Sequence, residues 1–171
     1  MDSNCKRILL TGFLLVLWGC SYHFSGSGSL PSGLTRIYVS MLENKTAESG
    51  IENYLTNELI NQFIMRRKDA LGTQEDAEGI LTGKIVYLQD IGIAHSSETV
   101  TTQSRVVLGV SLKLTDKKGK VVWAVNGINA NQAYDIVSTS QMTTEQNKKA
   151  AITILSKRLA EKIFNRLTDD F

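Results

Sequence analysis

Cysteine, histidine, proline and an excess of charge of one sign are all scarce in this chain. Its 171 residues include two cysteines, two histidines and one proline. Two cysteines allow one disulfide at most, so a disulfide-built scaffold is excluded. The 19 basic and 17 acidic residues nearly cancel, and this balance gives no indication of a nucleic-acid partner.

Groups that could carry out catalysis are equally sparse. His23 lies in a serine- and glycine-rich stretch, and His95 lies beside Ser96 in a polar stretch. A triad of His95, a nearby serine and Asp90 would need a third group held behind the imidazole, and no nucleophile elbow is present. No cysteine, histidine or carboxylate set has the spacing of metal ligands, and the acidic run is typical of a solvated connector (Glu75, Asp76 and Glu78). We therefore predict no catalytic residue, no metal and no cofactor.

What the chain does have begins at its N-terminus. Lys6 and Arg7 precede an apolar run over residues 8–18, which is shorter than the roughly 20 residues of a membrane-spanning helix. Such a run is typical of an export signal. Residues 1–19 are therefore predicted to be a signal peptide, and a signal anchor with an incidental cysteine is the alternative.

The residues at the end of this run, Leu17-Trp18-Gly19-Cys20, resemble the lipobox of bacterial lipoproteins. The resemblance implies that Cys20 receives a diacylglyceryl group and an acylated amino terminus, although Trp18 stands where the motif usually has a small residue. Ser21 in place of an aspartate implies sorting to the outer membrane. Several acyl chains anchor a protein stably where one does not. The mature chain would keep no free thiol, and loss of Asp2, Lys6 and Arg7 leaves 17 basic and 16 acidic residues.

The remainder of the chain divides into a tether and one domain. Residues 20–30 are rich in serine and glycine, as flexible linkers are, and form the predicted lipidated N-terminus and tether. Residues 31–171 suit a single domain with one core. No later segment has the length of a membrane-spanning helix.

Hydrophobic periodicity predicts the first two elements of this domain. Residues 34–42 alternate as a strand whose core face carries Ile37, Val39 and Met41. A capping box of Ser49 and Glu52 then opens a helix over residues 50–68. Its apolar stripe recurs every fourth residue and is widened by two further isoleucines (Ile51, Leu55, Leu59 and Phe63, with Ile60 and Ile64).

Three strands and a second helix follow. The strands are predicted at residues 81–88, at 105–114 and from 121 past a bend at Gly127, and alternation is clearest at Val106, Leu108, Val110, Leu112 and Leu114. Residues 94–103 are predicted to be an exposed hairpin end, and residues 116–119 a turn. Thr143 and Gln146 form a second predicted capping box before a helix over 144–167, with an apolar stripe (Ile152, Leu155, Leu159, Ile163 and Leu167).

The order strand-helix-strand-strand-strand-helix predicts an α+β fold. The economical packing is a four-stranded, mostly antiparallel sheet with both helices on one face. The opposite face would carry Arg105, Ser111 and Lys113 and remain open to water or to a partner.

Several short motifs, in order and spacing, resemble the lipopolysaccharide-assembly lipoprotein family, LptE. They are Cys20-Ser21-Tyr22-His23-Phe24, Leu30-Pro31, the strand from Ile37 leading to Asn44-Lys45-Thr46, Leu81-Thr82-Gly83-Lys84-Ile85, and the long closing helix. The resemblance implies a four-stranded sheet with two helices and a non-enzymatic role. It implies that the lipoprotein plugs the outer-membrane barrel LptD, helps that barrel assemble and helps insert lipopolysaccharide into the outer leaflet.

Lipopolysaccharide is anionic, so its contacts are expected from basic side chains near the open sheet face or its hairpin ends. The candidates are Lys84, Arg105, Lys113, Lys117, Lys118 and Lys120. The alternatives are another outer-membrane lipoprotein, acting on cell-wall synthases or in a secretion apparatus, and a lipid-anchored hydrolase. Synthase activators typically carry a longer tether, whereas ten residues reach only about 35 Å.

Overall fold

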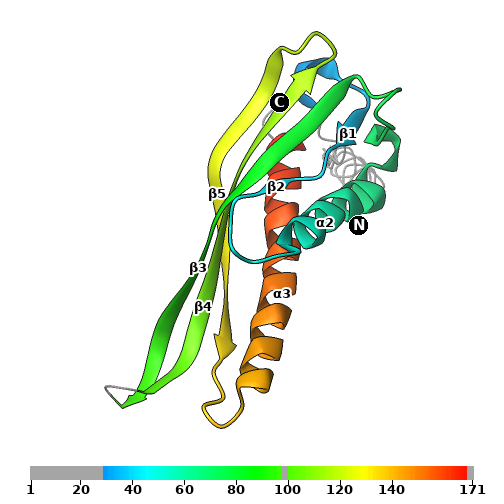
Figure 1. Ribbon diagram of the computed structural model, residues 1–171. Coiled ribbons are helices and arrows are strands. Elements are labelled where there is room, and N and C mark those ends of the chain that lie inside the picture. The colour runs from blue at the N-terminus through cyan, green and yellow to red at the C-terminus, as the bar shows by residue number, and fades with distance from the viewer. Residues whose placement is uncertain (1–28, 98–99, 169–171) are drawn as a thin grey trace, which may run out of the picture.

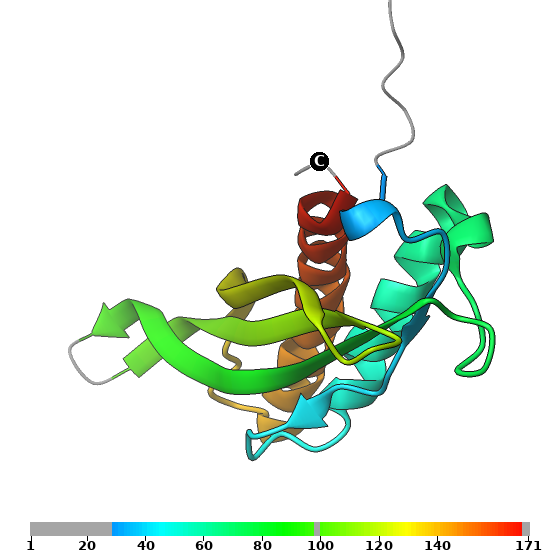
Figure 2. The same ribbon diagram turned by 90° about the horizontal axis from the view of Figure 1, so that it is seen from above.

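The structure, a computed structural model, describes residues 29–97 and 100–168. The predicted signal peptide, Cys20 and residues 21–28 of the predicted tether lie outside the described residues. A long twisted sheet carries two helices on one face, with α3 running along the sheet and α2 crossing beside it (Figures 1 and 2). The elements are η1 (Pro31–Gly33), β1 (Ile37–Val39), β2 (Glu43–Asn44), α2 (Ile51–Arg66), η2 (Lys68–Ala70), β3 (Gly79–Ser97), β4 (Val100–Asp116), β5 (Val121–Asp135) and α3 (Gln141–Thr168).

The α+β class and the placement of both helices are confirmed, and the sheet has five strands where four were predicted. β3, β4 and β5 form an antiparallel meander, and β1 and β2 both pair with β3 in parallel. Of the predicted strand over residues 34–42, only residues 37–39 form β1, and β2 begins just after its predicted end. Its alternation fails after Val39, because Met41 is 55% exposed and Leu42 is 1% exposed. The Leu42 amide donates to Thr56 Oγ1 of α2 at 3.1 Å, so a helix side chain replaces a sheet partner here.

The core lies between the sheet and the two helices. Every residue of the two predicted helical stripes is buried. Of the two isoleucines predicted to widen the first stripe, Ile60 is partly buried against the core, whereas Ile64 is 47% exposed. The predicted place of Ile64 on the buried face is therefore wrong. Phe63 of α2 meets Phe164 of α3 edge to face, with ring centroids 4.9 Å apart. Arg66 lies over the same Phe164 ring and pairs with Glu161 at 2.7 Å. Burying each large apolar side chain contributes roughly 1.5–3 kcal/mol.

Both predicted capping boxes are wrong. α2 begins after Gly50, whose φ of 88° is left-handed, and no side chain caps it. Glu52 instead accepts a hydrogen bond from Asn44 Nδ2 at 2.8 Å. α3 begins three residues before Thr144, and Ser140 Oγ accepts from the Thr143 amide at 3.2 Å. At α3, Ser140 thus takes the capping role that spacing assigned to Thr143, whereas at α2 no side chain takes it.

The hairpin of β3 and β4 is longer than predicted. Ala94 pairs with Gln103, and the ladder continues to Ser97 and Val100 through several register shifts. The predicted hairpin end over residues 94–103 does lie at the end of this hairpin, and much of it is paired backbone, because polar residues can form a ladder without an apolar face. The predicted turn after Asp116 and the bend at Gly127 are confirmed, with φ of 80° at Gly119 and 68° at Gly127. No described helix combines the length and apolar character needed to cross a bilayer.

Candidate binding surface

The face of the sheet away from the helices, called the outer face here, carries the polar half of each alternating strand. Leu81, Ile85, Leu112 and Leu114 point into the core. Thr82 and Lys84 therefore share the outer face with Ser111 and Lys113, to which the register pairs them as Thr82 with Lys113 and Lys84 with Ser111. This placement puts two of the predicted lipopolysaccharide contacts, Lys84 and Lys113, diagonally across neighbouring strands.

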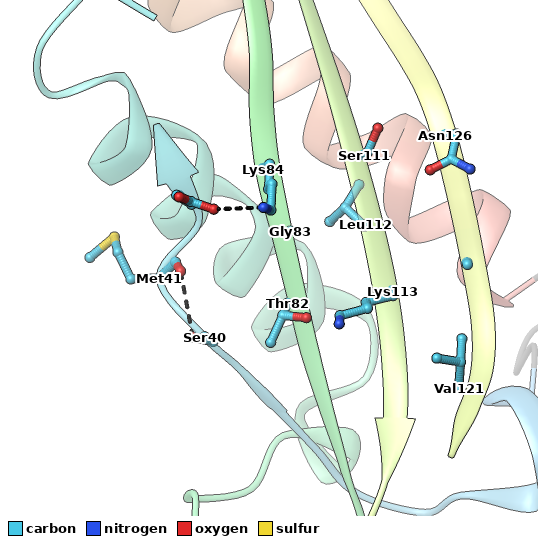
Figure 3. Close-up of a pocket in the computed structure, with 12 residues that line it drawn as sticks. Ser40, Met41, Thr82, Gly83, Lys84, Ser111, Leu112, Lys113, Val121 and Asn126 are labelled. Atoms are coloured by element: carbon cyan, nitrogen blue, oxygen red, sulfur yellow. Dashed lines mark hydrogen bonds and ion pairs between the residues drawn. The ribbon is translucent and has the colours of Figure 1, made fainter. Parts of the chain in front are cut away.

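A groove of about 490 Å³ lies on this face. Its lining includes Met41 from the segment after β1, Lys84 and Lys113 from the central strands, and Val121 at the start of β5 (Figure 3). Met41 is 55% exposed and Val121 is 50% exposed, so the groove combines apolar side chains with two lysines. A surface of this composition suits an amphiphile with an anionic group better than a small polar substrate.

Glu43 sets the charge at one side of the groove. Its carboxylate pairs with Lys84 at 3.2 Å and also with Lys45. Hydrogen bonds from the Lys45 and Lys84 side chains hold the pKa of Glu43 below its usual value, so this acid stays ionised and offsets part of the Lys84 charge. The Lys113 side chain makes no hydrogen bond or ion pair with any described residue. Lys113 is therefore the group in the groove most available to an anion.

The other predicted contacts lie elsewhere. Arg105 pairs in register with Ile91 and Ala133, eight residues along β4 from Lys113, which corresponds to roughly 26 Å of strand. The remaining three lysines belong to the turn between β4 and β5 and its edge (Lys117, Lys118 and Lys120). The six candidates therefore form a groove pair, a turn cluster and one separate arginine.

A polar cluster that sequence reasoning missed lies on the helix-covered face of the sheet. Asp90 accepts hydrogen bonds from Ser104 Oγ at 2.5 Å and from the Tyr134 hydroxyl at 2.6 Å. The ammonium nitrogen Nζ of Lys148, on α3, lies 3.7 Å from Asp90 Oδ2 and 3.3 Å from Glu48 Oε2. Burial and the neighbouring Asp90 raise the pKa of Tyr134 to about 12. These five residues, called the far cluster below, join three strands, α3 and the segment before α2.

A register shift explains why this cluster was not predicted. β3 changes register between Ile85 and Tyr87, so the residues after the shift alternate in the opposite phase. Tyr87 then lies over Gly109 on the outer face, where a Cβ would approach the tyrosine ring to 2.3 Å. Asp90 consequently points towards α3. Its neighbours in the cluster are 14, 44 and 58 positions away in the chain, beyond any local pattern.

The carboxylates considered for chemistry have structural partners. Asp90 is held by the two hydroxyls just described, and the side chain of His95 lies outside the described part of the structure. Asp76 accepts from Thr73 and pairs with Arg36 at 2.9 Å, and Glu78 accepts from the Thr35 amide at 2.7 Å. These contacts lower the pKa of both acids, which is the opposite of what a general acid needs. Across the described residues no three potential ligands gather as a metal site.

Comparison with known proteins agrees with this architecture. Three solved lipoproteins share the fold. Lipoprotein B from Nitrosomonas europaea has a TM-score of 0.59 at 14% identity, covering 84% of this chain and 87% of its own. Rare lipoprotein B from Shewanella oneidensis has a TM-score of 0.55 at 11% identity, covering 76% and 95%. A minor lipoprotein from Acinetobacter baumannii has a TM-score of 0.54 at 14% identity, covering 80% and 92%.

At these identities the solved structures show the fold alone, and no curated protein sequence matches the chain. The family comparison goes further, because the LptE family model, described as lipopolysaccharide-assembly, matches residues 34–167. This range is most of the chain and runs from before β1 almost to the end of α3. This chain therefore belongs to the LptE family of lipopolysaccharide-assembly proteins.

Proposed function

We propose that this chain is an outer-membrane lipoprotein that plugs the lipopolysaccharide-transport barrel LptD, aids assembly of that barrel and aids insertion of lipopolysaccharide into the outer leaflet. Residues 1–19 act as the signal peptide, acylated Cys20 and the tether to residue 30 hold the protein to the membrane, and residues 31–171 form the plug. The observation that carries the proposal is the family match over residues 34–167. The protein acts by binding and not as an enzyme.

The shape of the described domain supports this role. A plug must present a polar surface to the polar lumen of a barrel while keeping its own core intact. The outer face does so around the groove, where Lys84, Ser111 and Lys113 lie with Asn126 beside them. The two helices cover the opposite face and complete the core without the partner.

A pull-down from detergent-solubilised outer membranes tests the partnership. The lipidated protein should recover a large barrel protein, because the plug and the barrel share an extensive surface. A Cys20→Ala variant should be released into the periplasm if the lipid is the main tether. Recovery of peptidoglycan synthases or secretion components, without a barrel, would contradict the proposal and favour one of the alternatives.

The groove gives the proposed contact with lipopolysaccharide. Lys113 and Lys84 would pair with its phosphate groups while Met41 and Val121 contact apolar atoms. We expect the Lys84→Ala/Lys113→Ala variant to bind purified lipopolysaccharide about ten-fold more weakly in a fluorescence titration, since each charge-assisted hydrogen bond contributes on the order of 1.5–3 kcal/mol before solvent screening. Lys68→Ala/Lys157→Ala removes two lysines outside the groove and is the matched control. Equal affinity for both double variants would remove the groove from the proposal.

A further inference from the structure

We propose that the end of the domain at which the chain enters rests on an anionic phospholipid surface, with the turn of residues 116–120, called the basic turn here, as the contact. The inference rests on the proposed acylation of Cys20 and adds a second, electrostatic contact to it. Three of the five residues in the turn are lysines, and all three are exposed. The side chains of Lys118 and Lys120 have no hydrogen-bond or ion-pair partner among the described residues.

The backbone of the basic turn is held rigidly from within. Asp116 Oδ1 accepts from the Lys118 and Lys120 amides, each at 2.9 Å, and the Gly119 amide donates to the Asp116 carbonyl at 3.0 Å. Gly119 supplies the left-handed φ of 80° that closes the turn. The one acid of the turn thus faces its own amides, while the three ammonium groups extend into solvent. A turn fixed in this way presents its charge without a large ordering cost.

The start of the described chain lies beside this turn. Asp116 pairs with Gly79, and a Cβ at Gly79 would lie 2.8 Å from Leu34 Cδ1, so Leu34 packs against the base of the turn. The Thr35 amide donates to Glu78, whose carboxylate in turn feels the charge of Lys117. η1 lies just before Leu34, and Figures 1 and 2 place it at the same end of the molecule as the turn between β4 and β5.

The length of the tether places this end near the bilayer. Ten residues separate Cys20 from Leu30, and ten residues span at most about 35 Å when fully extended. A domain held this closely meets the membrane repeatedly, and the end that meets it is the one carrying the basic turn. Lysine is a compact point charge that suits headgroup phosphates. Each lysine near an anionic surface strengthens adsorption about five-fold, and the polar turn gives contact without insertion.

The test uses the full lipidated protein in vesicles. A Lys118→Cys variant carries an environment-sensitive dye, and spin-labelled headgroups in the vesicle quench it by proximity. Cys5 is removed with the signal and Cys20 is acylated, so the new cysteine provides the free thiol. Arg105→Cys, on the outer face far along β4, is the matched reporter. Flotation measures anchoring in the same samples.

We expect strong quenching at position 118 when phosphatidylglycerol is present, at least three-fold weaker quenching in pure phosphatidylcholine, and little quenching at position 105. Adding Lys117→Glu and Lys120→Glu should abolish the difference between the lipids. Adding Lys84→Glu and Lys113→Glu, the same change of charge in the groove, should leave it intact. Because the amides, Asp116 and Gly119 that hold the turn remain, these variants should keep their far-ultraviolet circular dichroism.

Equal quenching in both lipids, or quenching that survives charge reversal in the turn, would overturn the proposal, because the tether alone would then explain proximity. Strong quenching in vesicles that contain lipopolysaccharide, but not in vesicles that contain phosphatidylglycerol, would also overturn it. A protein that fails to float contradicts the anchor at Cys20, and the turn contact with it. Loss of the barrel from the pull-down with normal quenching would count against the barrel partnership alone.

Discussion

The two halves of the long sheet are held to the helices by different combinations of apolar and polar contacts. In the near half, from Gly79 to Ile85 of β3 and the residues paired with them, the space beneath the helices is filled by apolar side chains such as Phe63 and Leu114. In the far half, from Leu88 onwards, the sheet extends past α2 and faces only the first turns of α3 (Figure 1). There the buried apolar side chains of Val106 and Leu108 are joined by the polar far cluster around Asp90.

This difference bears on which half can move. Apolar burial is cooperative and large, whereas a partly exposed hydrogen-bonded cluster contributes little net free energy. Local opening therefore costs less in the far half.

The largest effect is expected in the near half. Phe63→Ala removes a fully buried ring that meets Phe164 at 4.9 Å, and it should lower the free energy of unfolding by about 3–5 kcal/mol. Denaturant unfolding followed by circular dichroism measures this loss. Met65→Ala, at a side chain that is 65% exposed on the same helix, should cost less than about 0.5 kcal/mol. Similar losses for the two variants would contradict an apolar near half.

An intermediate effect is expected where the halves join. Gly109→Ala would place a methyl group 2.3 Å from the Tyr87 ring, so the ring must leave its position over the strand. We expect a loss of about 1–3 kcal/mol, as for other overpacked sites. The same measurement on Gly109→Ala in a Tyr87→Ala background separates crowding from backbone effects, because removing the ring should recover most of the loss. No recovery would place the cost in the strand itself.

The same contrast explains which parts of the fold could be predicted from sequence. Val106, Leu108, Val110, Leu112 and Leu114 alternate without interruption, and all five are buried. The helical stripes succeed for the same reason, because burial leaves a local period in the sequence. The early end of the first strand at Val39 and the continuation of β3 through residues 94–97 depend on hydrogen bonds to distant residues. Those bonds leave no local period.

The candidate groove was half predictable. Alternation places Lys84 and Lys113 on the open face, but only the register brings them together, and a register is a relation between two strands. Glu43, which neutralises part of the Lys84 charge, comes from a two-residue strand that no pattern indicated. The far cluster was unpredictable because the shift between Ile85 and Tyr87 reverses the phase of β3 from Tyr87 to Gly92.

The smallest effect is expected in the far half. Tyr134→Phe removes the hydroxyl that donates to Asp90 at 2.6 Å, and it should cost about 1 kcal/mol at neutral pH, because a hydrogen bond to a charged group in a partly exposed site is weakened by solvent. Amide hydrogen exchange should quicken along Asp90 and Ser104 while the near half keeps its protection. Uniformly faster exchange in both halves would show that the sheet opens as one unit.

The same variant has a signature in pH. Tyr134 has a pKa of about 12 in the folded protein against an ordinary value of 10.0, so the unfolded chain loses the phenolic proton first. The stability that this difference represents is complete below pH 10 and is lost as pH rises from about 10 to about 12. We therefore expect the thermal midpoint of the parent to fall more steeply over that interval than that of Tyr134→Phe. Tyr54→Phe, at a tyrosine that is 51% exposed, should keep the parent's slope, and a shallow slope in this control as well would assign the alkaline loss to tyrosines in general.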